Sequence, residues 1–162
     1  MKRTVLVLFA ALLILGGCQK QTTVDTTADV LASAVLHATP EHEFTRADDD
    51  FVESGFDAPE ALRESAVYFA SDAGETCEFG IFCLIDAARA EDMVRAVRRY
   101  LEQERAAVES LSALYPGDEL EKRLACYRDA LVGVSGNIVY YFAMDSDAVQ
   151  RAQQSLQSAL NA

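Results

Sequence analysis

Short and almost entirely apolar runs, separated by turn residues, recur along the chain and predict β-strands. They read AVYFA at residues 66–70, FGIFCLI at 79–85 and IVYYFA at 138–143, with a further strand near 130–134. A tight hairpin in which Gly136 and Asn137 adopt positive φ explains the turn before the last run. The pattern therefore predicts two β-hairpins.

A helix is predicted after each hairpin and before the first one. Val24, Ala28, Leu31 and Val35 have helical spacing and predict an opening helix that ends near Thr39-Pro40. Similar apolar spacing follows the hairpins at about 90–111 and from about 147 onward, and a short helix is predicted at 119–125. Because hairpins pair antiparallel, the sequence predicts an α+β domain: an opening helix and two ββα units that form a four-stranded antiparallel sheet packed with helices.

The strands hardly alternate between apolar and polar residues, so both faces of the sheet should be covered. Two helices are enough for one face. The other face needs the opening helix, a second copy of the chain, a partner or a ligand. If it were left open, Tyr68, Phe82 and Tyr140 or Tyr141 would form an apolar patch and a possible binding surface.

Two charged segments are predicted to be solvated. The segment 41–59 is polar and contains three consecutive aspartates at 48–50, but it lacks the order of ligands of a calcium loop, so we predict a loop and no metal site. On the long helix, four-residue spacing predicts ion pairs on an exposed face. These pairs are Glu91 with Arg95, Arg98 with Glu102, and Arg105 with Glu109.

The amino-terminal segment has the features of a secretory signal. Lys2 and Arg3 precede an apolar run at residues 5–15, which is much shorter than the ~20 residues that a membrane-spanning helix needs. The run ends in Leu15-Gly16-Gly17-Cys18, which resembles the lipobox of bacterial lipoproteins. The resemblance implies that Cys18 receives a diacylglyceryl thioether before cleavage between Gly17 and Cys18, and two acyl chains would hold the chain stably at a membrane.

This interpretation divides the chain into a signal peptide at 1–17, a lipidated cysteine with a short tether at 18–27, and one domain at 28–162. Nine extended residues reach at most ~30 Å, so the domain should stay close to the membrane. Loss of Lys2 and Arg3 lowers the net charge from −12 to −14. Such an acidic chain is repelled by nucleic acid, which is therefore not an expected partner.

The remaining cysteines are Cys77, Cys83 and Cys126. Cys77 and Cys83 lie ~20 Å apart along one predicted strand and cannot bridge each other. Whether Cys126 bridges either of them stays open, and a buried, reduced Cys83 is the favoured interpretation.

No catalytic constellation and no cofactor motif is recognised in the sequence. Only two histidines are present, at positions 37 and 42. Gly133-Val134-Ser135-Gly136-Asn137 approaches the nucleophile motif G-x-S-x-G, but Asn137 replaces the last glycine and a strand follows where that motif needs a helix.

The order of several short motifs resembles the DUF4358 family of small bacterial lipoproteins. These motifs are Ser54-Gly55-Phe56-Asp57, AVYFAS, Cys77-Glu78-Phe79-Gly80-Ile81-Phe82, Tyr115-Pro116 and Gly136-Asn137-Ile138-Val139. The resemblance covers most of the chain after about residue 27. It implies a place at the outer face of the cell membrane, or sorting to the outer membrane in a Gram-negative cell, and it implies no reaction.

Two function classes follow. The first is a membrane-anchored, non-catalytic binding or accessory module that contacts a membrane or surface protein. The second is an extracytoplasmic enzyme or small-ligand binder that uses acidic residues such as Glu75, Glu78 and Asp86. A deep pocket that gathers those carboxylates would favour the second.

Overall fold

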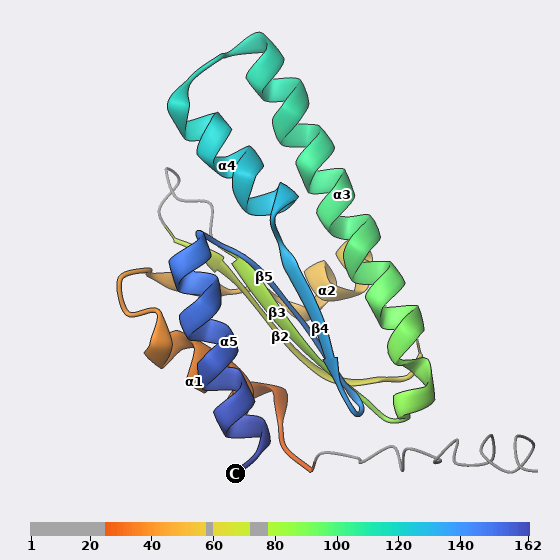
Figure 1. The fold of residues 1–162 in the computed structure, drawn as a ribbon. Helices are drawn as coiled ribbons and strands as arrows, with labels where there is room; N and C mark the ends of the chain where they lie inside the picture. Colours follow the sequence, from red (N-terminus) through yellow and green to blue (C-terminus); the bar gives the residue numbers. More distant parts are fainter. Residues whose placement is uncertain (1–24, 58–59, 72–77) are drawn as a thin grey trace, which may run out of the picture.

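The computed structural model describes residues 25–57, 60–71 and 78–162. Within them, five α-helices pack on one antiparallel sheet of five strands (Figure 1). The helices are α1 (Ala28–Ala38), α2 (Asp49–Phe56), α3 (Ala90–Leu114), α4 (Asp118–Arg128) and α5 (Ser146–Leu160), and a short 3-10 helix covers Ala87–Arg89. The strands are β1 (Phe44–Arg46), β2 (Leu62–Ala70), β3 (Glu78–Leu84), β4 (Leu131–Ser135) and β5 (Ile138–Ala143).

The strand order is β1-β2-β3-β5-β4, with β4 and β1 at the two edges. The mixed α and β composition and the antiparallel sheet agree with the prediction from the sequence. The predicted count of four strands is wrong, because β1 lies in the segment that was predicted to be a loop. Its single aromatic residue, Phe44, packs edge-on against Phe79 of β3, with ring centroids 5.3 Å apart.

The helix α2 lies in the same acidic segment and is the second correction to the predicted loop. The Asp48 side chain accepts a hydrogen bond from the Phe51 amide (2.8 Å) and so caps the helix. Asp49 and Asp50 follow in the first turn, where negative charge interacts favourably with the helix dipole. Val52 and Phe56, four residues apart, are buried against the sheet. The aspartates therefore begin a helix, and no group of three or more metal-ligating side chains occurs in the described ranges.

Helices cover both faces of the sheet, as the continuous apolar strands predict. All seven residues of β3 and all six of β5 are buried. The helices α1 and α5 pack on one face, and α2 and α3 pack on the other (Figure 1). The opening helix α1 does cover the sheet, as one of the alternatives from the sequence had it, but it shares its face with α5. The expectation that two helices cover one face and the opening helix covers the other is wrong in this detail, because α3 lies on the opposite face together with α2.

The possible binding surface named from the sequence is wrong as a surface, because those aromatic side chains belong to the core. Phe82, Tyr140 and Tyr141 are buried and Tyr68 is half-buried. Tyr68 and Tyr140 pack toward α1 and α5, whereas Phe82 and Tyr141 pack toward α2 and α3. The four rings are thus divided between two separate cores.

The turn between β4 and β5 differs slightly from the predicted one. Gly136 has a φ of 58°, but Asn137 does not adopt positive φ. Instead, the Asn137 side chain is buried and its amide nitrogen donates to the Leu84 carbonyl oxygen (2.9 Å). The Leu84 amide in turn donates to the Asn137 carbonyl oxygen (2.8 Å), so Asn137 ties the hairpin to the end of β3. A strand follows Ser135, as the sequence indicates, and the geometry of a nucleophile motif is absent at this described turn.

Cys83 and Cys126 are free thiols. Cys83 is buried beneath α1, and this burial raises the pKa of its thiol to about 11, which keeps it protonated and unreactive. Cys77 and Cys18 lie outside the described residues, as do Gly17 and Glu75. Among the described helices, none has the length and apolar character needed to cross a membrane.

Candidate functional site

A depression on the described surface lies between α3 and the edge strand β4. One part, of about 660 Å³, is lined by Arg98, Leu101 and Arg105 of α3, Tyr127 and Arg128 of α4, and Val132 of β4. A second part, of about 510 Å³, is lined by Ala90, Val94 and Arg95 of α3 and Val134 of β4. We call the two parts together the α3–β4 groove. Figure 1 shows β4 as the outermost strand, with α3 running beside it.

Arginine side chains dominate the charge of the α3–β4 groove. Arg95, Arg98, Arg105 and Arg128 line it, against the carboxylates of Glu91 and Glu102. Four arginines and two glutamates line the groove, so its lining has an excess of two positive charges on a chain whose net charge is −12. A groove of this charge attracts anionic groups to an otherwise acidic molecule.

These arginines are not equally engaged. Arg105 donates to both carboxylate oxygens of Glu102 (3.0 and 2.6 Å), Arg95 bonds to Asp92, and Arg128 bonds to Asp129 (3.1 Å). The pairs on α3 thus have three-residue spacing, and the predicted four-residue ion pairs on this helix are wrong. Arg98 makes no ion pair or hydrogen bond within the described part of the chain, which leaves its guanidinium group available for a ligand.

Tyr127 forms one wall of the α3–β4 groove, and a buried carboxyl lies behind this side chain. Glu78, at the start of β3, is 3% exposed. Its Oε2 accepts hydrogen bonds from the hydroxyl of Tyr100 (3.0 Å) and from that of Tyr127 (3.2 Å). Its other oxygen, Oε1, and the hydroxyl of Tyr141 are both buried without a hydrogen bond of normal length. We call Glu78 and these three tyrosines the Glu78 cluster.

Burial raises the pKa of the Glu78 carboxyl to about 7. The hydrogen bonds from Tyr100 and Tyr127 oppose this rise, and the negative charge of Glu104 adds to it. A proton on Glu78 would give the buried carboxyl a donor of its own and remove the cost of a buried charge. The Glu78 cluster joins β3 and β5 to α3 and α4 and thereby holds one wall of the groove in place.

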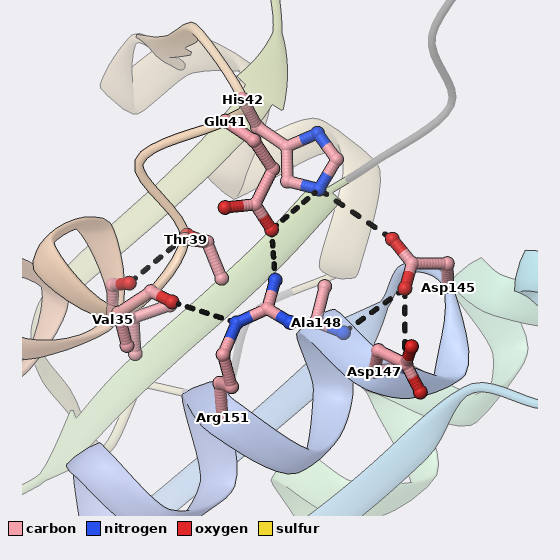
Figure 2. Close-up of polar contacts among 9 residues, drawn as sticks. Val35, Thr39, Glu41, His42, Asp145, Asp147, Ala148 and Arg151 are labelled. Carbon is pink, nitrogen blue, oxygen red and sulfur yellow. Dashed lines mark hydrogen bonds and ion pairs between the residues drawn. The ribbon is translucent and has the colours of Figure 1, made fainter.

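A second polar cluster, shown in Figure 2, connects the segment after α1 to the start of α5. His42 Nε2 lies 3.6 Å from Glu41 Oε1 and 3.5 Å from Asp145 Oδ2. Asp145 caps α5 by accepting from the amides of Asp147 and Ala148 (both 3.0 Å). Arg151 of α5 bonds to Glu41 and donates to the Ala38 carbonyl oxygen (3.1 Å). These contacts fasten two helices and a loop, which is a structural role.

The acidic residues named from the sequence do not gather in one site. Glu78 is buried at the first residue of β3, whereas Asp86 is exposed two residues beyond its last. Asp86 accepts a hydrogen bond from the Ala88 amide (2.9 Å) and caps the short 3-10 helix. Neither residue lines the α3–β4 groove.

A smaller apolar group is exposed at the end of the α3–α4 hairpin, which projects beyond the sheet (Figure 1). Leu114 is 72% exposed and Tyr115 69% exposed, and Leu111 lies one turn before them. The flanking residues Glu109 and Asp118 are acidic.

No family model, curated protein or solved structure matches the chain. The assignment of a function therefore depends on the residues and the geometry described above.

Proposed function

We propose that this protein is a membrane-anchored extracytoplasmic lipoprotein whose domain is a non-catalytic binding or accessory module, and that the α3–β4 groove is its binding surface. The lipid anchor on Cys18 would hold it at the outer face of the cell membrane, or at the outer membrane in a Gram-negative cell. The partner would be a membrane or surface protein. The lipobox-like sequence and the resemblance to DUF4358 lipoproteins support the location.

The observation that carries the binding function is the row of arginines in a groove on an acidic chain. Four guanidinium groups line the α3–β4 groove, and Arg98 has no ion pair within the described ranges. Arginines that only keep a protein soluble can be spread over its surface and do not need to line one groove together. A row of cations beside partly exposed valines offers both charge and apolar area to a partner.

The second function class, an enzyme or ligand binder that uses Glu75, Glu78 and Asp86, has no comparable support. Glu78 is almost completely enclosed and Asp86 caps a helix. Glu75 lies outside the described residues.

The anchor is tested by the Cys18→Ala substitution. Without the thiol no thioether forms, so we expect the precursor to remain uncut by the lipoprotein peptidase and to migrate more slowly than the wild type on a gel. Metabolic labelling with a fatty-acid analogue should mark the wild type and leave the variant unlabelled. An equal label on both proteins, or equal mobility, would contradict the lipid anchor.

The groove is tested by charge reversal at Arg98. Chemical crosslinking of the anchored protein in its native cells should capture one dominant partner, and Arg98→Glu should reduce that capture by about tenfold, as expected when a contact charge is reversed. The matched control is Lys122→Glu, which makes the same change in net charge on α4 outside the α3–β4 groove. Equal capture by wild type and Arg98→Glu would contradict the proposal, and so would equal losses in both variants.

A further inference from the structure

We propose that the partner segment bound in the α3–β4 groove is an extended acidic peptide, which joins the sheet as a sixth strand next to β4. This inference depends on the proposed function, since it names the chemistry of the partner at the same site. It combines three observations: a free strand edge, an apolar stripe on that edge, and the row of arginines beside it.

Strand β4 is an edge strand that no other described strand pairs with on its outer side. Strand β4 pairs with β5 over all five of its residues, in continuous register, and with no other described strand. Edge strands of soluble proteins usually carry a charge, a proline or a bulge that prevents pairing with another chain. The sequence of β4, LVGVS, has no charged residue and no proline. The opposite edge strand, β1, has only three residues and ends in Arg46.

The register of the hairpin indicates which backbone groups are available. Ser135 and Ile138 flank a two-residue turn, and such flanking residues normally exchange hydrogen bonds with each other. Because the bonded pairs alternate, we expect Val132 and Val134 to direct their N–H and C=O groups away from β5. Two residues of β4 thus present donors and acceptors to an incoming strand.

The side chains of the same two residues face α3. Val132 lines the larger part of the α3–β4 groove and Val134 the smaller part, where Val134 is 49% exposed. A strand added beside β4 would lie between this edge and α3, and every second side chain would point into the groove. Apolar side chains at those positions would cover Val132 and Val134.

The charge of the α3–β4 groove favours an acidic peptide over a second copy of this chain as the added strand. A second copy of the chain that paired through its own β4 would bring its own unpaired Arg98 to the same groove, and the repulsion between the two like charges is unfavourable. An anionic segment would instead complement them. A continuous acidic and apolar peptide fits both the backbone edge and the charge of the α3–β4 groove, and strand addition of this kind is a common mode of peptide recognition.

The experiment uses the full lipidated chain in detergent micelles and a displayed library of random peptides of about ten residues, which is sufficient to span a strand. We expect the enriched peptides to alternate acidic and apolar residues. Binding of a synthetic copy should weaken with added salt and fall by about tenfold with Arg98→Glu, because a groove charge is reversed. Enriched peptides without acidic residues would overturn the inference, as would a self-associated wild type whose dimer forms through β4.

The backbone pairing is tested separately. Two N-methylated versions of the selected peptide are made, one methylated at its odd and one at its even positions, so that each loses half of its backbone donors without a change in charge. In an added strand only every second N–H group faces β4, so we expect one version to lose binding and the other to retain it. On the protein, Val134→Pro removes an outward N–H group and should weaken binding by about tenfold, whereas Val134→Ala retains it and should weaken binding less. If both N-methylated peptides bind like the parent, strand addition is wrong even if Val134→Pro fails to fold.

Different results would reject the α3–β4 groove as a binding site and the addition of a strand to β4. Loss of cellular capture in Arg98→Glu, together with tolerance of N-methylation, would leave the α3–β4 groove as a binding site and reject the added strand. Cellular capture that is unaffected by Arg98→Glu would reject the groove itself.

Discussion

The free energy of unfolding of the Glu78→Gln protein, taken relative to the wild type, is expected to be about 3 kcal/mol higher at pH 8 than at pH 4.5. The pKa of Glu78 is about 7 in the folded protein, against an ordinary value of 4.5. A carboxyl whose pKa is raised on folding contributes stability below its unfolded pKa and loses that contribution as the pH rises toward its folded pKa. The wild type should therefore lose stability between about pH 4.5 and 7, at about 1.4 kcal/mol per pH unit.

Glutamine has nearly the shape of a protonated glutamic acid and does not titrate. Its oxygen can accept from Tyr100 and Tyr127, and its amide group can donate to the hydroxyl of Tyr141. Denaturant unfolding of both proteins at pH 4.5, 6, 7 and 8 measures the difference. Glu104→Gln is the control, because it removes a nearby negative charge that raises the pKa of Glu78 but leaves the buried carboxyl in place. A parallel pH dependence for wild type and Glu78→Gln would show that Glu78 is not buried as described.

Gly80→Ala is expected to destabilise the fold by about 3 kcal/mol, at the upper end of the usual range for overpacking. A Cβ at this position would lie 2.4 Å from Cε1 of Tyr141 and 3.1 Å from Cε2 of Phe82. Tyr141 is fully buried against Phe56 and Tyr100, with ring centroids 5.9 and 6.1 Å away, so its ring has little room to move. Any displacement of the ring would also disturb the Glu78 cluster.

Gly117→Ser is the matched control for Gly80→Ala. A Cβ at Gly117 meets no atom within 4 Å, and serine at this helix-capping position should be neutral or slightly stabilising. Urea unfolding of the three proteins at pH 6 should show a large fall in midpoint for Gly80→Ala alone. A free energy of unfolding of Gly80→Ala within about 0.5 kcal/mol of the wild type, as is usual for surface substitutions, would mean that Tyr141 does not occupy the space beside β3.

The elements that could be predicted from the sequence are those with strong local signals. The runs of β2, β3 and β5 are apolar on both sides, and this pattern is sufficient to predict buried strands and a sheet with two covered faces. The long helix α3 is amphipathic over many turns. In contrast, β1 has one apolar residue in three, and it exists because Phe44 pairs with Ala70 and packs on Phe79. Such long-range contacts leave no periodic signal.

The candidate site could not be predicted from the sequence, because it too is formed by contacts between residues far apart along the chain. Glu78 is visible in the sequence as an acidic residue at the start of a strand, but its burial depends on tyrosines from α3, α4 and β5. The arginines of α3 suggested a solvated face with internal ion pairs. Their common groove forms only because β4 is an edge strand beside α3 and because α4 brings Arg128 to the same place.

Whether the α3–β4 groove binds the partner can be decided by site-specific photocrosslinking in the native cells. A photoreactive residue would replace Val134 in the groove, Val30 on the far side of the sheet or Leu114 at the hairpin tip, and these three side chains are 49%, 58% and 72% exposed. We predict a single strong adduct from position 134 and none from positions 30 and 114. An adduct from position 114 or 30, with none from position 134, would contradict the assignment of the groove as the binding surface.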